Sequence, residues 1–380
     1  MNNLPSRPML SRRNFFKLLA AVGVTTVGAY ALIEVAPWLD YEAQVNHIRR
    51  PLERNVTLSA QIRELIRYAT LAANGHNTQP WQFALTEDAI EIHPDYTRRL
   101  PVVDPDDREL WISLGCALEN FLIAARAAGY AAEVTYPETA DTIRVRLTAD
   151  TSQNSPLFKA IEHRQNTRSE YDGQPVKATD LDTVQALPLE PGVALRYVLN
   201  PSELETVLEY VNQGNLRQYA DHAFVDELIT WLRFNKKEAI ASCDGLFSRC
   251  SGNPEVPGWL GRMFVAGTKP QQQADIDAKK LRSSSGAVVI TSETDDKATW
   301  VRTGQVYERL ALKLTALNIK SAFLNQSIEV ADLRLQLQSA LGLGGSSPQL
   351  LLRFGYADAM PRSLRRPVDQ VIITSGRNQS

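Results

Sequence analysis

The sequence predicts an α+β fold assembled from two related halves. The first observation is a helical pattern over 57–73, followed by two alternating segments, 81–85 and 89–92, that are typical of a β-hairpin. The second is a long apolar helix expected over 109–128. The third is a later segment whose residues repeat those of this helix. A hairpin beside long helices favours the α+β class.

The order of the elements follows from spacing and from turn residues. The first helix carries apolar residues at helical spacing, and Thr57 or Ser59 is expected to cap it. The acidic stretch 104–107 opens the long helix and Gly129 ends it, because glycine tolerates a left-handed stop. Further on, the pattern predicts strands at 143–147 and 349–354, a helix at 330–341, and a mostly helical region at 210–263, and 371–373 is a short apolar run.

The repeat is visible in two long helices. Each residue of the second set lies 189 positions after its counterpart, without a gap, as Gly115 and Gly304 illustrate. The matched residues are Trp111 and Trp300, Glu119 and Glu308, Ala127 and Ala316, and Gly129 and Asn318. The simplest physical explanation is a fused homodimer whose repeated helices pack across a pseudo-twofold axis.

Gly115 and Gly304 are unexpected inside helices. Each costs about 1 kcal/mol relative to alanine in a helix interior. We therefore expect a tight approach of a second helix or of a ligand at both positions.

Composition excludes several classes of protein. The chain has 380 residues, of which 44% are hydrophobic and 22% charged, so it is long enough for two domains or one large one. The formal charge is −2, which gives no global positive field for nucleic acid. Three Cys and five His are too few and too scattered for a zinc framework, so no metal site is expected.

The N-terminus has the pattern of an export signal. Residues 11–17, Ser-Arg-Arg-Asn-Phe-Phe-Lys, resemble the twin-arginine (Tat) motif, and a mildly apolar run follows over 18–33. This run is shorter than the roughly 20 residues of a comfortable membrane span, and 29–31 offers an Ala-x-Ala cleavage site. We predict a Tat signal over 1–36, periplasmic localisation, and the Tat translocase as partner during export. A retained signal would anchor the protein in the inner membrane.

The cysteines leave one question open. Cys243 and Cys250 are seven residues apart and could pair in an oxidising compartment, or stay reduced. Cys116 lies in the apolar helix and is expected to be a small core residue.

Four segments together resemble the nitroreductase family over about residues 57–375. The loop 72–81, Ala-Ala-Asn-Gly-His-Asn-Thr-Gln-Pro-Trp, is similar to the flavin loop of that family, with Asn-Gly where the family has a serine pair. Residues 112–120 look like its central helix, and 163–171 resemble its Arg-x-Ser-x-Arg-x-Phe segment. Residues 351–356, with Arg365-Arg366 beyond them, resemble its last core strand and basic tail.

The distribution of these motifs resembles the single-chain duplicated, Acg-like branch of the family. The loop occurs in the first half, and the arginine segment and tail in the second. The resemblance implies a central, mainly antiparallel sheet with surrounding helices, and two fused pseudo-repeats. These would span 55–150 and 151–380, with a lid insertion around 210–275 that includes the Gly- and Pro-rich loop 252–261. The fused chain is expected to be monomeric with one flavin site.

The resemblance also implies flavin mononucleotide (FMN) as the cofactor and assigns its contacts. Guanidinium groups suit a phosphate because their donors are paired and planar. The flavin itself carries the chemistry, so no catalytic side chain is predicted, and His76 is expected to be structural rather than an acid. The predicted cofactor-binding residues are Arg164, Arg365 and Arg366 at the phosphate, Arg168 at the ring, Asn77 and Gln79 at ring or ribitol oxygens, Asn325 or Gln326 near N5, and Asn166. Asn77 and Gln79 could instead only satisfy the backbone of their loop, as turn amides often do.

Three functions remain open from the sequence. The first is an exported FMN-dependent oxidoreductase that passes a hydride to a nitroaromatic, a quinone or a similar small-molecule acceptor. The second is a flavin-binding or flavin-sequestering protein with a closed lid and no nitroreductase turnover. The third is a cofactor-free periplasmic binding protein that has kept only the scaffold, since a fold does not fix a function.

Overall fold

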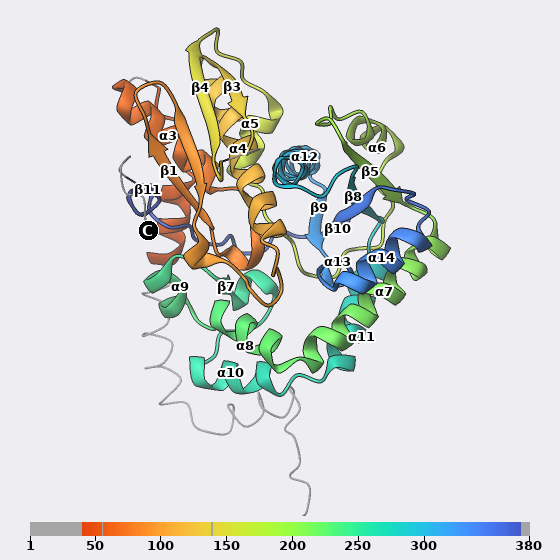
Figure 1. Ribbon diagram of the computed structural model, residues 1–380. Helices are drawn as coiled ribbons and strands as arrows, with labels where there is room; N and C mark the ends of the chain where they lie inside the picture. Colours follow the sequence, from red (N-terminus) through yellow and green to blue (C-terminus); the bar gives the residue numbers. More distant parts are fainter. Residues whose placement is uncertain (1–39, 55, 138–139, 374–380) are drawn as a thin grey trace, which may run out of the picture. The chain divides into compact units, whose positions relative to one another are not determined.

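The computed structural model describes residues 40–54, 56–137 and 140–373. The chain divides into two compact units, Met1–Gln44 and Val45–Ser380. In the first unit, residues 40–44 are described and are helical. The predicted export signal, including its apolar run, lies outside the described residues. All elements named below belong to the second unit, and Figure 1 labels most of them.

The first half of the fold forms a five-stranded sheet in the order β11-β1-β2-β4-β3. The predicted hairpin is confirmed, because β1 and β2 pair antiparallel. All neighbours in this sheet are antiparallel except β11, which comes from the end of the chain and pairs parallel with β1. Its elements are α3 (Leu58–Thr70), β1 (Trp81–Leu85), β2 (Ile90–Pro94), α4 (Arg108–Ala128), β3 (Tyr130–Thr135), β4 (Ile143–Ala149), α5 (Pro156–Ile161) and β11 (Ile372–Ile373).

The second half forms a separate four-stranded antiparallel sheet in the order β5-β8-β10-β9. The strands β8 and β10 are central, and nearly all their residues are buried. Its elements are α6 (Ala178–Gln185), β5 (Val193–Val198), α11 (Pro270–Arg282), β8 (Gly286–Ser292), α12 (Lys297–Ala316), β9 (Lys320–Phe323), α13 (Gln326–Glu329), α14 (Ala331–Ala340) and β10 (Ser347–Gly355).

A mostly helical segment is inserted into the second half, between β5 and α11. Its prediction as mostly helical over 210–263 is confirmed. It consists of α7 (Pro201–Ala220), α8 (His222–Trp231), α9 (Lys236–Ser242) and α10 (Gly258–Ala266), with the short parallel pair β6 (Leu232–Arg233) and β7 (Leu246–Phe247) and the 3₁₀ turn η3 (Ser248–Ser251).

The two long helices α4 and α12 pack on each other between the two sheets (Figure 1). Trp111, Phe121 and Tyr307 of these helices lie fully inside the main core, with Leu352 of β10. Among the described residues, one helix, α4, has the length and hydropathy of a membrane span, and almost all of it is buried in this core.

The predicted close approach at the helix glycines is a helix–helix contact. A Cβ on Gly115 would lie 2.0 Å from the carbonyl oxygen of Val301, and a Cβ on Gly304 would lie 2.0 Å from that of Ile112. Val301 is 189 residues after Ile112, so the two contacts exchange equivalent positions. This reciprocity is what a twofold arrangement of two copies produces.

The helix ends follow the predicted chemistry. The Asp104 carboxylate accepts hydrogen bonds from the N–H groups of Glu109 and Leu110 at 3.0 and 2.9 Å, so Asp104 caps α4 in place of its neighbour Asp107. Thr57 caps α3, which resolves the choice between Thr57 and Ser59. The predicted left-handed stop at Gly129 is confirmed, with φ of +92°, and its repeat counterpart Asn318 has φ of +58°.

The α+β class with mainly antiparallel pairing is therefore confirmed, with the strands divided between two main sheets. Each sheet packs against one of the two long helices, α4 against the first and α12 against the second. The C-terminal tail returns to the first half through β11. It thereby carries the basic residues before it toward the loop that follows α3.

Replacing Gly304 by Ala is expected to destabilise the fold, although alanine favours helices by about 1 kcal/mol over glycine. The new Cβ would meet the Ile112 carbonyl, and overpacking of this kind costs about 1–3 kcal/mol. Urea denaturation should show a lower midpoint. Gly345→Ala is the control, because a Cβ there meets nothing within 4 Å. A Gly304→Ala protein as stable as the wild type would contradict this crossing.

Candidate functional site

One pocket brings together segments that are far apart in the sequence. It lies where the loop after α3 meets the arginine segment, the stretch around β7, and the C-terminal tail. Its cavity volume is about 50 Å³. The residues that line it are Arg49, Ala73, Asn74, Asn77, Arg164, Gln165, Asn166, Arg168, Gly245, Leu246, Phe247, Cys250, Pro361, Ser363 and Arg365.

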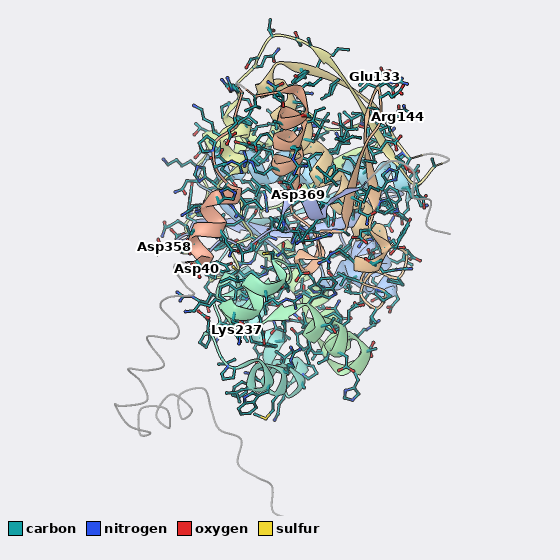
Figure 2. The ribbon with its side chains drawn as sticks, turned by 90° about the vertical axis from the view of Figure 1, so that its left-hand side faces the viewer. Asp40, Glu133, Arg144, Lys237, Asp358 and Asp369 are labelled. Atoms are coloured by element: carbon teal, nitrogen blue, oxygen red, sulfur yellow. The ribbon has the colours of Figure 1, made fainter. Side chains whose placement is uncertain are left out.

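Four arginines line this small space, whereas the outer surface carries both charge signs. Glu133 and Lys237, labelled in Figure 2, are exposed examples of each sign. A cluster of guanidinium groups around a small cavity favours the binding of an anionic ligand there. We call this cavity the arginine pocket.

Arg164 is paired on one side only. It is 5% exposed, and its Nε lies 3.1 Å from Oε1 of Glu308. Its Nη2 donates to the carbonyl of Leu71 at 3.3 Å, but its buried Nη1 makes no hydrogen bond within the described part of the chain. Burial raises the pKa of Glu308. The charge of Arg164 and the hydrogen bond from the Ala73 N–H lower it, but they do not outweigh burial. A buried donor without a partner favours binding of an acceptor from outside the chain.

Arg168 faces the same pocket as an uncompensated cation. No hydrogen bond or ion pair joins its guanidinium to another residue in the described ranges. Burial lowers the pKa of Arg168, and the neighbouring charge of Arg164 adds to this effect. Two such arginines side by side repel each other, so an anion between them would stabilise both.

Arg365 reaches the pocket, but its donors are already used by the protein. Its guanidinium donates to the carbonyls of Thr70 and Ala72 at 2.8 and 3.1 Å, at the end of α3. It also donates to Oδ1 of Asn77 at 2.8 Å. A cation at a helix C-terminus is favourable, so Arg365 shapes the pocket by closing α3.

Asn77 and Gln79 hold the wall of the pocket. The Asn77 side chain donates to the carbonyl of Gly245 at 2.9 Å, and the N–H of Gly245 donates back to the Asn77 carbonyl at 3.1 Å. The Gln79 side chain donates to the carbonyl of Cys243 at 2.9 Å. Asn77 lines the pocket, whereas Gln79 is fully buried outside the lining.

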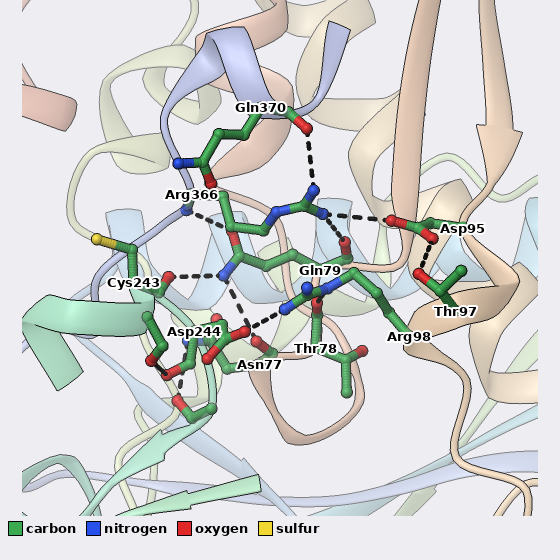
Figure 3. Close-up of polar contacts among 12 residues, drawn as sticks. Asn77, Thr78, Gln79, Asp95, Thr97, Arg98, Cys243, Asp244, Arg366 and Gln370 are labelled. Atoms are coloured by element: carbon green, nitrogen blue, oxygen red, sulfur yellow. Dashed lines mark hydrogen bonds and ion pairs between the residues drawn. The ribbon is translucent and has the colours of Figure 1, made fainter. Parts of the chain in front are cut away.

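An ion pair completes this contact (Figure 3). Arg98 donates to the Thr78 carbonyl and pairs with Asp244, and Arg233 donates to the same carboxylate at 2.6 Å. Burial would raise the pKa of Asp244, but the bonds from Ser242, Arg233 and Arg98 outweigh it and the pKa is lowered. The carboxylate is therefore charged at neutral pH. We call the bonds between 77–79, Arg98 and 243–245 the loop junction.

The backbone of the loop itself is held in an uncommon form. His76, Asn77 and Gln79 all have φ near +50°, in the left-handed region that residues other than glycine rarely adopt. The N–H of Gln79 donates to Oδ1 of Asn74 at 2.9 Å and closes the turn. Such strain persists only where surrounding contacts enforce it, and it is common at binding sites.

His76 is neutral in this environment. Burial, with the charge of Arg168, lowers the pKa of His76 to about 4. Its buried Nδ1 has no hydrogen-bond partner within the described residues. A neutral imidazole carries no extra proton at pH 7, in keeping with the expected structural role.

The remaining predicted site residues divide between the pocket and other places. Asn166 lines the pocket and accepts a hydrogen bond from the Tyr307 hydroxyl at 3.3 Å. Arg366 lies outside the lining, where it donates to the carbonyls of Gln79 and Gln370 and pairs with Asp95 at 3.5 Å (Figure 3).

Asn325 and Gln326 also lie outside the lining. The Asn325 side chain donates to Glu109 at 3.2 Å, and the Gln326 side chain donates to Asp277 at 2.9 Å. Both amides belong to a polar network around α13. The structure therefore gathers Asn77, Arg164, Asn166, Arg168 and Arg365 at one pocket, and leaves Gln79, Asn325, Gln326 and Arg366 outside it.

The pocket wall comes from 245–250 rather than from the Gly- and Pro-rich loop 252–261. Trp259 of that loop is 70% exposed and starts α10 instead of covering the pocket. Cys250 lines the pocket, and no disulfide links it to Cys243 in the described structure.

Sequence reasoning missed two contributors. Glu308 was visible as a member of the repeat, but its pairing with Arg164 could not be read from that pattern. Arg49 precedes the predicted fold, yet it lines the pocket and donates to the Ser363 carbonyl at 2.8 Å.

The sequence has relatives among curated proteins. It is 29% identical over 325 residues to "Putative NAD(P)H nitroreductase Rv3131" of Mycobacterium tuberculosis, covering 82% of this chain and 90% of that protein. It is 26% identical over 328 residues to "Putative NAD(P)H nitroreductase acg" of the same species, covering 82% and 94%. No protein-family model matches the chain.

Solved structures of nitroreductases are also similar, at a low level. A Bacteroides fragilis nitroreductase with bound FMN matches at 15% identity and a TM-score of 0.34, covering 56% of this chain and 96% of that one. The FMN-dependent nitroreductase NfnB of Mycobacterium smegmatis, in complex with NADPH, matches at 12% identity and a TM-score of 0.35, covering 55% and 94%. Along most of its length the chain is thus similar to mycobacterial proteins described as putative NAD(P)H nitroreductases.

Proposed function

We propose that the protein is an exported FMN-dependent oxidoreductase of the nitroreductase kind, with the arginine pocket as the phosphate end of its flavin site. The observation that carries this proposal is the unused Nη1 donor of buried Arg164, in a pocket that Arg168 also lines. Both arginines stand where the resemblance expects flavin contacts. A nitroaromatic or a quinone is the proposed acceptor, and NAD(P)H, named in the mycobacterial relatives, is the first donor to test.

The residues present fit an anionic cofactor. Nη1 of Arg164 and the guanidinium of Arg168 would bind phosphate or ring oxygens, and Asn166 lies beside them in the lining. Bound FMN would supply the hydride chemistry that no side chain of the pocket supplies. The positive charge of Arg168 would stabilise negative charge on a reduced ring. Asn77, Gln79, Arg365 and Arg366 would act indirectly, by holding the loop and the tail.

We further propose one site per chain, in a monomer built as a fused pair. The reciprocal contact of Gly115 and Gly304 supports the duplication. Glu119 is the counterpart of Glu308, but Arg309 binds both of its oxygens, at 2.8 and 2.9 Å, and also pairs with Glu190. The charges at this second position are thus satisfied within the chain. Export to the periplasm is proposed from the Tat-like sequence.

Flavin sequestration without turnover is the second candidate. Pockets for ligands of this size have volumes of about 300–1,000 Å³. The arginine pocket has about 50 Å³ and is walled by 245–250, which the loop junction ties down. A flavin ring therefore needs the wall to move, and a wall that recloses over the ring would exclude NAD(P)H.

Visible absorbance of the full chain, purified from a host with a Tat system, tests the proposal. We expect the bands of oxidised flavin, with bleaching on addition of NADPH. If dithionite bleaches the bands but NADPH does not, the result would favour flavin sequestration or a different electron donor. Absence of the bands, even after FMN is added, would refute both flavin functions.

Arg168→Met is expected to weaken FMN binding by about tenfold to a hundredfold, because hydrogen bonds to a charged group contribute about 1.5–3 kcal/mol. Flavin fluorescence quenching measures the affinity. Arg282→Met is the control, since Arg282 pairs with Glu205 at the exposed surface. Equal affinities in the wild type and Arg168→Met would place the anion elsewhere.

Asp244→Asn is expected to loosen the loop junction, because it leaves Arg98 and Arg233 without their shared carboxylate. FMN should then dissociate several-fold faster in stopped-flow experiments. If the wild type sequesters flavin, this variant should also gain bleaching by NADPH. Asp332→Asn, which disturbs an exposed ion pair with Arg217 and a hydrogen bond from Gln336, is the control. An unchanged dissociation rate would show that the 245–250 wall does not control access.

A further inference from the structure

A fully buried arginine stands behind the arginine pocket. Arg353 lies on the central strand β10, opposite Ala287 of β8 and Ala322 of β9, and is 0% exposed. No carboxylate forms an ion pair with it within the described part of the chain; burial lowers the pKa of Arg353, and the more distant charges of Asp277 and Glu170 offset only part of this effect. Burying a cation without a counter-charge is costly, so its hydrogen bonds must be favourable enough to keep it there.

These hydrogen bonds go to the backbone on both sides of Arg168. Nη2 of Arg353 donates to the carbonyl of Thr167 at 3.3 Å and to that of Ser169 at 2.7 Å. Nη1 donates to the carbonyl of Lys280 at 3.2 Å. Arg353, a residue of the second sheet, thus fixes the peptide groups on both sides of Arg168.

Aromatic and backbone contacts complete the same arrangement. The guanidinium carbon of Arg353 lies 3.9 Å from the ring centroid of Tyr171, a cation–π contact. The Tyr171 hydroxyl donates to the Thr167 carbonyl at 3.1 Å, and the Thr167 N–H donates to the carbonyl of Ser321 at 2.9 Å. Apart from a bond from Arg353 to the Ser284 hydroxyl at 3.4 Å, these hydrogen bonds hold the main chain, and none uses the Arg168 side chain.

We propose that Arg353 is a positioning residue, which fixes the segment 164–172 so that the unpaired guanidinium of Arg168 faces the arginine pocket. Only a guanidinium, with several donors in a fixed plane, can reach the Thr167, Ser169 and Lys280 carbonyls together. Lysine keeps the charge but has a single ammonium group. The inference rests on the proposed function for its effect on flavin binding, but its structural part is independent of any ligand.

Hydrogen exchange of the ligand-free protein tests the structural part. Arg353→Lys should exchange about tenfold faster in peptides from 164–172, with little change elsewhere, because the lost bonds are local. Arg334→Lys is the matched control, since Arg334 is also largely buried but bonds the Pro348 carbonyl and Asp295. Unchanged exchange over 164–172 would overturn the proposal, and so would a rise spread over the whole chain.

A second variant, Tyr171→Phe, keeps the proposal testable if Arg353→Lys does not fold. Tyr171→Phe removes the hydroxyl bond to Thr167 and keeps the ring beside Arg353. If Arg353→Lys does not fold, faster exchange of Tyr171→Phe confined to 164–172 supports the proposal. Unchanged exchange there contradicts it.

A double-mutant cycle on FMN affinity tests the functional part. Arg353→Lys should weaken binding by about tenfold in the wild-type background and should have no further effect in Arg168→Met, because Arg353 acts through Arg168. Equal losses in both backgrounds would show a merely structural residue. If the wild type binds no FMN, the proposed function fails, while the exchange result still decides whether Arg353 positions the segment.

Discussion

The reciprocal crossing of α4 and α12 determines the rest of this structure. Two glycines allow backbone to touch backbone, and no side chain fits between them. Glu308 follows Gly304 by one helical turn, so the crossing carries its carboxylate to the Ala73 N–H and to Arg164. The site is therefore built from both halves of the chain, and a shift of the crossing would separate the loop after α3 from the arginine segment.

The electrostatics of the site follow from how many partners each buried arginine has within the protein. Arg365 is committed to the end of α3, and Arg353 is committed to the backbone around Arg168. Arg164 is half-compensated by Glu308, and Arg168 is not compensated at all. In a low-dielectric interior this leaves a net positive potential aimed at one small cavity. Protein carbonyls and Glu308 offset part of the free energy lost by burying these cations, and an anion bound at Arg164 and Arg168 would stabilise the site further.

Much of the fold could be predicted because its signals are local. The hairpin, the two long helices and their stops depend on periodicity and on residues such as Gly129 and Asn318. The pocket was harder to predict, because Asn325 and Gln326 were placed by analogy of position and in fact bond Glu109 and Asp277. Asn77 and Gln79 are turn amides whose partners, 243–245, lie more than 160 residues away, and no local pattern specifies such a contact. The N-terminal signal stays a prediction, since it lies outside the described residues.

The central claim is that one arginine pocket, formed once per fused chain, binds one flavin. Equilibrium titration of the flavin-free full chain with FMN, followed by calorimetry, tests this claim most directly. The account predicts saturation at one FMN per chain, with affinity that weakens as salt screens the arginines. Two equivalent sites per chain, or no binding at any concentration, would contradict it.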